Sequence, residues 1–186
     1  MALKKAARSR RDFLKASAGM TGALGVMGFP AGLGRVLDAI SPGVQRLTQT
    51  YPQVALAKIS DLIEGEPVDF RYPLEEQFNF LVKLGTPAIG GVGPAGDIVA
   101  FSYICSHMGC PMNGLYNEKH KMLGPCPCHY SRFDLSKGGI LILGQATQTL
   151  PQIVLETRGE EIHATGVTGL IYGYWNNVEG GVAVHS

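Results

Sequence analysis

The stretch 105–131 reads CSHMGCPMNGLYNEKHKMLGPCPCHYS, and the fold of the chain depends on it. It contains all four cysteines of the sequence and three of its five histidines. Two pairs stand out, because Cys105 lies just before His107 and Cys126 lies just before His129. Thiolate sulfur and imidazole nitrogen are common metal ligands, and two such pairs can converge from two tight loops on one metal centre.

Two kinds of centre fit two thiolates and two imidazoles. Structural zinc takes all four ligands in a tetrahedron. In a 2Fe–2S cluster of mixed ligation, two histidines hold one iron and two cysteines hold the other. If the ligands close on such a cluster, the two loops face each other, and Cys110 and Cys128 would be neighbours within reach of a disulfide. Zinc does not require that further pair, and a visible absorption spectrum would separate the two centres.

The two loops resemble the boxes of Rieske proteins. CSHMGC (105–110) matches C-x-H-x-G-C, and CPCHYS (126–131) matches C-x-C-H-x-S. The resemblance implies one Rieske-type 2Fe–2S cluster per chain and a disulfide between Cys110 and Cys128. It implies these four cluster ligands, two on each iron: Cys105 and Cys126 on one, His107 and His129 on the other.

Other residues of the segment receive supporting roles. The resemblance implies that Gly109 and Gly124 supply turn conformations that residues with a side chain resist. His120, His163 and His185 are expected to be non-ligands, because no cysteine motif accompanies them.

The remainder of the sequence after residue 50 predicts an all-β fold. Its apolar runs are rich in β-branched and aromatic residues and are bounded by Gly, Pro or Asn, which is typical of short strands. They are YPQVALAKI (51–59), FNFLVKLG (78–85), DIVAFSYI (97–104), GILILG (139–144), QIVLETRG (152–159), EIHATGV (161–167) and GLIYGYW (169–175). Their spacing favours an antiparallel sandwich or barrel.

The domain organisation follows from the position of the boxes. We expect a Rieske domain over 46–186, in which a base domain (50–102 and 151–186) carries an inserted cluster-binding subdomain (about 103–150). ISDLIEGE (59–66) is predicted to form a short helix or an irregular connection.

The N-terminal residues 1–45 predict an export signal. SRRDFLK (9–15) places two adjacent arginines before a weakly apolar stretch at 17–33, and this layout resembles a twin-arginine (Tat) signal. The sequence therefore predicts a periplasmic protein, and an uncleaved N-terminal anchor in the inner membrane is the alternative to a removed signal. A disulfide persists in the bacterial periplasm, which agrees with this location.

Charge is distributed unevenly along the chain. Seven of the 16 Lys and Arg residues and two of the 15 acidic residues lie in 1–45, so the rest carries nine basic and 13 acidic residues. A body of net negative charge is a poor binder of nucleic acid, and no nucleic-acid partner is expected.

Beyond the boxes, the chain resembles the small subunit of arsenite oxidase. The matching segments include VKLGTPAIGGVGPAGDIVAF (82–101), GQATQTLPQIVLE (144–156) and GVTGLIYG (166–173). The resemblance implies an electron-transfer subunit with no catalytic residue of its own. Its partners would be a large molybdopterin and iron–sulfur catalytic subunit and a periplasmic cytochrome c or blue-copper protein. The alternatives are the small subunit of a related iodate reductase and the Rieske subunit of a cytochrome bc-type complex.

Two departures from the bc-type proteins bear on the redox potential and the partner. In those proteins a Ser and a Tyr after box two donate hydrogen bonds towards the cluster, whereas this chain has Ser131 and Phe133. Because one donor is missing, we predict a potential below that of quinol-oxidising Rieske proteins. The segment GQATQTLP (144–151) also lacks the proline-rich loop that docks on a quinol site, so no quinol pocket is expected as partner.

Overall fold

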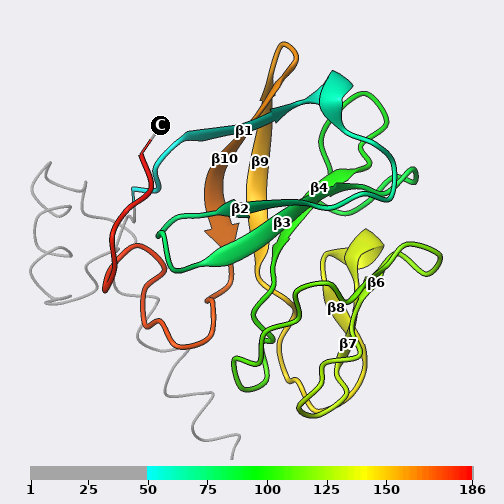
Figure 1. Ribbon diagram of the computed structural model, residues 1–186, viewed down its shortest axis with the longest axis vertical. Coiled ribbons are helices and arrows are strands. Elements are labelled where there is room, and N and C mark those ends of the chain that lie inside the picture. The colour runs from blue at the N-terminus through cyan, green and yellow to red at the C-terminus, as the bar shows by residue number, and fades with distance from the viewer. Residues whose placement is uncertain (1–49, 186) are drawn as a thin grey trace, which may run out of the picture. The chain divides into compact units, whose positions relative to one another are not determined.

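The computed structural model describes residues 50–185, and these form two antiparallel sheets (Figure 1). The six-stranded base sheet has the order β1-β10-β9-β4-β3-β2, and the four-stranded small sheet has the order β5-β6-β7-β8. The strands are β1 (Val54–Lys58), β2 (Val68–Arg71), β3 (Phe78–Lys83), β4 (Ile98–Ser102), β5 (Tyr116–Asn117), β6 (Met122–Leu123), β7 (Arg132–Asp134), β8 (Ile140–Leu143), β9 (Gln152–Arg158) and β10 (Glu161–Thr168).

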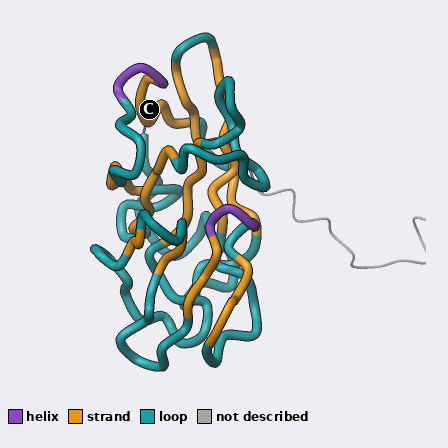
Figure 2. Tube along the Cα trace, turned by 90° about the vertical axis from the view of Figure 1, so that its right-hand side faces the viewer, coloured by secondary structure: helices purple, strands orange, loops and turns teal. Residues whose placement is uncertain are grey.

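Helix is confined to two short 3-10 turns among the described residues (Figure 2). They are η1 (Ile59–Asp61), which follows β1, and η2 (Leu135–Lys137), which follows β7. The predicted all-β class is therefore confirmed, and the segment expected to be a short helix or a connection begins with η1.

The centre of the base sheet is buried on both faces. All five residues of β4 are buried, and so are the four central residues of β3. Alternate side chains of a strand point to opposite faces, so Phe80 and Val82 join one hydrophobic core while Leu81 joins the other. The first core also contains Cys105 and Cys126, which means that the base sheet packs directly beneath the two boxes.

The small sheet lies within the segment predicted to bind the cluster. Its strands run from Tyr116 to Leu143, between two parts of the chain that form the base sheet. Box one, 105–110, follows β4, whereas box two, 126–131, connects β6 and β7. Box one therefore extends from the base sheet and box two from the small sheet. The boxes lie close together because both sheets contribute to the same hydrophobic core.

One predicted strand is wrong. The run GLIYGYW (169–175) forms turns and bends, with positive φ angles at Gly169 and Gly173. The amide of Asn177 donates to the carbonyl of Gly169 at 2.8 Å, and its side-chain oxygen accepts from the N–H of Ile171 at 2.9 Å. These bonds satisfy backbone groups that a strand would have paired with a neighbour, so the segment stays a loop.

The predicted export signal over 1–45 lies outside the described residues. Within 50–185, no helix has the length and apolar character needed to span a membrane.

Candidate iron–sulfur centre

The two boxes are loops of the same construction. In box one, the N–H of Cys105 donates to the carbonyl of Cys110, and the N–H of Gly109 donates to the carbonyl of Cys105, both at 2.9 Å. Box two repeats this pattern, because the N–H of Cys126 bonds to Ser131 and the N–H of Tyr130 bonds to Cys126, both at 2.8 Å. Each six-residue motif therefore closes on itself.

Glycine permits two of the turns around the boxes. Gly109 has φ 72° and Gly124 has φ 116°, which are conformations that side-chain-bearing residues rarely adopt. A Cβ atom on Gly124 would also lie 2.6 Å from the carbonyl oxygen of Ser131. Both glycines therefore have the turn role that was predicted for them.

The structure arranges the four predicted ligands as two neighbouring pairs, one of thiols and one of imidazoles. Cys105 and Cys126 are each only 1% exposed and lie on the core side, where the two thiols are neighbours. His107 and His129 lie on the outer side, with their Nδ1 atoms 3.2 Å apart and their rings nearly perpendicular. Two sulfur donors beneath and two nitrogen donors above match the ligand set of a mixed-ligation 2Fe–2S cluster.

The surroundings of the Cys105 thiol oppose its ionisation when no metal is bound. Burial raises the pKa of the Cys105 thiol, and the neighbouring Cys126 thiol raises it further, while hydrogen bonds from the backbone N–H groups of His107 and Met108 lower it. Adjacent thiolates in an apolar core are unfavourable unless a metal neutralises them. The backbone N–H groups of His107 and Met108 are thus placed to donate to the Cys105 sulfur once it is ionised.

The predicted disulfide between Cys110 and Cys128 is confirmed, with an S–S distance of 2.08 Å. The sulfur of Cys126 also lies within 4.8 Å of both bridge sulfurs. This group of three sulfurs is not a second metal site, because the two bridge sulfurs are bonded to each other and are not thiolates. The bridge instead ties the two boxes together beside the ligands.

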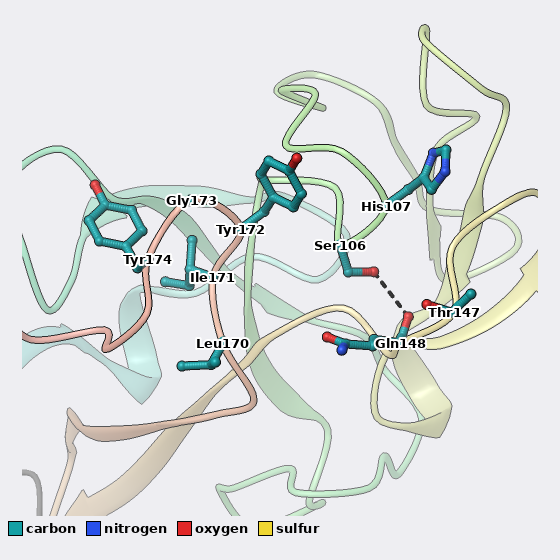
Figure 3. A pocket seen from close by; sticks show the side chains of 9 residues that line it. All are labelled: Ser106, His107, Thr147, Gln148, Leu170, Ile171, Tyr172, Gly173 and Tyr174. Carbon is teal, nitrogen blue, oxygen red and sulfur yellow. Dashed lines mark hydrogen bonds between the residues drawn. The ribbon is translucent and has the colours of Figure 1, made fainter.

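A third loop, 144–149, is attached to both boxes. The Oγ atom of Ser131 accepts from the N–H groups of Gln145 at 3.2 Å and Ala146 at 3.3 Å. On the other box, the hydroxyl of Ser106 donates to the carbonyl of Gln148 at 3.0 Å (Figure 3). Ser131 is fully buried and, among the described residues, donates to no protein acceptor. Its proton is therefore free for the cluster.

Replacing Ser131 with Ala is expected to lower the midpoint potential of the cluster. A hydrogen bond to a charged acceptor contributes about 1.5–3 kcal/mol, which for a one-electron couple corresponds to roughly 60–130 mV. Protein-film voltammetry of the cluster-loaded chain measures the change.

A substitution at Phe133 should have the opposite effect on the potential. Phe133 is fully buried in the core that holds the ligand cysteines, so Phe133→Tyr adds a hydrogen-bond donor and should raise the potential. Unchanged potentials in both variants would contradict this account.

The remaining histidines lie apart from the centre. His120 is in the turn between β5 and β6, and its backbone N–H bonds to Asn117. His163 is on β10, where its Nε2 lies 3.2 Å from a carboxylate oxygen of Glu161. Neither joins the ligand group, as expected from the sequence.

The C-terminal segment 170–174 borders the site, which the sequence did not reveal. It lines a recess of about 320 Å³ together with Ser106, His107, Thr147 and Gln148 (Figure 3). Its Tyr172 ring packs against Gly109 of box one. Its sequence, GLIYGYW (169–175), predicts a strand, and its aromatic residues indicate core or interface packing without placing them beside box one.

Comparison with known proteins gives matches over most of the chain. Residues 53–154 match the family described as Rieske [2Fe-2S] domain. The iodate reductase subunit IdrB of Denitromonas iodatirespirans is 47% identical over 177 residues, which cover 95% of this chain and 90% of that protein. The IdrB subunit of Pseudomonas sp. (strain SCT) is 43% identical, with coverages of 92% and 85%.

More distant matches support the same assignment. The cytochrome bc1 complex Rieske iron-sulfur subunit of Streptomyces lividans is 44% identical over 63 residues, or 34% of this chain and 36% of that protein. The crystal structure of the soluble domain of the Rieske protein II (soxF) from Sulfolobus acidocaldarius superposes with a TM-score of 0.56 and 28% identity, covering 63% of this chain and 78% of that chain. The chain therefore belongs to the Rieske [2Fe-2S] domain family, whose cofactor is a Rieske-type 2Fe–2S cluster.

Proposed function

We propose that this chain is the electron-transfer small subunit of a periplasmic molybdopterin oxidoreductase of the iodate reductase type. The observation that carries the proposal is the identity of 47% with an iodate reductase subunit over nearly the full length of both proteins. Iodate reductase was the alternative in the sequence interpretation, and it now replaces arsenite oxidase as the main assignment. Arsenite oxidase remains the second candidate, because the segments at 82–101 and 144–156 resemble its small subunit.

The proposed ligands give the chain a buried side and an exposed side. Cys105 and Cys126 would hold one iron against the core, and His107 and His129 would hold the other near the surface. When bound, the cluster supplies a one-electron redox couple. The protein positions it so that the histidine side, where the rings are accessible, is the shorter way for an electron to enter or leave.

The direction of transfer follows from the type of enzyme. In an iodate reductase, this chain would take electrons from a periplasmic cytochrome c or blue-copper donor and pass them singly to the large catalytic subunit. In an arsenite oxidase, electrons would flow in the opposite direction, from the large subunit through this chain to the soluble protein. The chain needs no catalytic residue in either case, because the oxyanion is converted on the large subunit.

The absorption of the cluster itself provides the test. We expect that adding iodate to the dithionite-reduced two-subunit complex restores the oxidised visible spectrum, whereas arsenite does not bleach the oxidised complex. The isolated small subunit serves as control and should respond to neither anion. Bleaching by arsenite would assign the second candidate, and no response of the complex to either anion would reject both.

A further inference from the structure

Tyr130 occupies a backbone conformation that suits glycine. It is the fifth residue of box two, as Gly109 is of box one, and the two loops close with the same pair of backbone hydrogen bonds. The φ angles are 72° at Gly109 and 61° at Tyr130. A bulky aromatic residue is unfavourable in this left-handed region, whereas glycine is not. The folding of the loop therefore does not account for a tyrosine at this position.

A second tyrosine takes the corresponding place on box one. A Cβ atom built on Gly109 would lie 2.4 Å from Cδ1 of Tyr172, so the ring of Tyr172 fills the space where a side chain of residue 109 would begin. Each box thus has one tyrosine ring at its fifth residue. Box two provides the ring from its own sequence, whereas box one receives the ring of Tyr172, which Figure 3 shows on the C-terminal segment.

Both rings remain available to a partner. Tyr130 is 69% exposed and Tyr172 is 46% exposed, and Met108 beside them is also exposed. Tyr130 directly follows His129 in the chain, and Tyr172 lines the recess that contains His107. The two tyrosines therefore flank the pair of histidines at the outer side of the centre.

The four segments that carry these rings and the histidines contain no acidic, lysine or arginine residue. They contact one another through the histidines, the serine bonds and Tyr172. Although 21 charged residues lie between 50 and 185, none falls in these segments, which are 104–117, 124–131, 140–151 and 168–178. Lasting subunit interfaces have charge-depleted, aromatic-rich centres, whereas short-lived encounters between soluble proteins are steered by complementary charges.

We propose that Tyr130 and Tyr172 anchor the histidine side of this chain to an uncharged surface of the large catalytic subunit. The inference rests on the proposed function and names the surface that serves it. The recess of about 320 Å³ beside His107 would receive a side chain of that subunit. The unfavourable backbone of Tyr130 is then retained because the ring contributes to association and not to the stability of the free chain.

The test compares the binding of purified large catalytic subunit to the cluster-loaded full chain and to its Tyr130→Gly variant. We expect Tyr130→Gly to raise the Kd by about 30-fold or more, as truncation of an interface anchor does. The thermal midpoint of the free variant should not fall, because glycine suits the backbone there. Tyr130→Phe should bind as the unchanged chain does. Ile63→Ala removes a similarly exposed apolar side chain (60%) from the connection between η1 and β2, and it should have no effect.

Each outcome separates this inference from the proposed function. If the unchanged chain does not bind the large subunit, both are rejected. If it binds and Tyr130→Gly binds within threefold of it, the docking inference is rejected while the proposed function stands. If Tyr130→Gly leaves the complex intact but slows reduction of the cluster by a soluble c-type cytochrome, the surface belongs to the donor and the inference is again overturned.

Discussion

Chains with Cys105→Ala will purify without the visible absorption of a 2Fe–2S cluster and without bound iron. The reason is that Cys105 and Cys126 are the only two free thiols among the four cysteines. No other thiol is available to replace Cys105 as a ligand. The remaining cysteines are joined in the disulfide and are not thiolates. Absorption spectroscopy and iron analysis of the purified chain measure the loss, which should be complete.

The matched control is the double variant Cys110→Ala, Cys128→Ala, which removes two sulfurs but none of the proposed ligands. It should retain iron and colour when freshly purified. Retention of two irons per chain by the Cys105→Ala variant, or a colourless double variant, would contradict the ligand assignment.

That double variant is expected to lose stability although it keeps the cluster. The bridge closes a loop with a sequence separation of 18 residues. In the chain-entropy account, such a loop restricts the unfolded chain by about 3 kcal/mol, which corresponds to a fall of the apparent melting temperature on the order of 10 °C. Thermal unfolding of the cluster-loaded chain, followed by the visible absorption, measures it.

A chemical control accompanies the disulfide prediction. Cys128 is exposed, so a mild phosphine reductant should reach the bridge and lower the melting temperature of the unchanged chain. The double variant has no bridge and should not respond to the reductant. Equal melting temperatures of the unchanged chain and the double variant would show that the bridge contributes nothing.

The local features of the site could be predicted from the sequence. The ligand pairs lie within four residues of each other, and a loop that short is closed by its own backbone, as the repeated hydrogen bonds of the two boxes show. The strands β3, β4, β8, β9 and β10 could also be predicted, because each coincides with an apolar run that is typical of a strand. In each of these cases the information that determines the structure is contained in adjacent residues.

Features that depend on distant contacts could not be predicted. β5, β6 and β7 have only two or three residues, too few for a periodic pattern. The segment 169–175 has the composition of a strand, but the side chain of Asn177 binds its backbone groups and keeps it a loop. The position of Tyr172 over Gly109 likewise joins residues that are far apart in sequence.

The sequence of this chain does not distinguish iodate from arsenite as the substrate of the complex, and the reason is different from the one that applies to the short strands and loops. Under the proposed function the oxyanion would be bound and converted on the large subunit, so no side chain of this protein would need to distinguish the two anions. Residues such as those at 144–151 shape the surroundings of the cluster and are compatible with both enzymes. Only the comparison over the full length of the chain favours one of them.

The attachment of the loop 144–149 to both boxes bears on the rate of electron transfer. An electron moves quickly between proteins when the atoms around each cofactor barely shift as its charge changes. Here Ser106 and Ser131 each form a hydrogen bond to the backbone of the loop 144–149. The two boxes that contain these serines are also joined by the disulfide. Because three loops are joined around the site, the atoms that surround a bound cluster are expected to shift little when its charge changes, which would favour fast electron transfer.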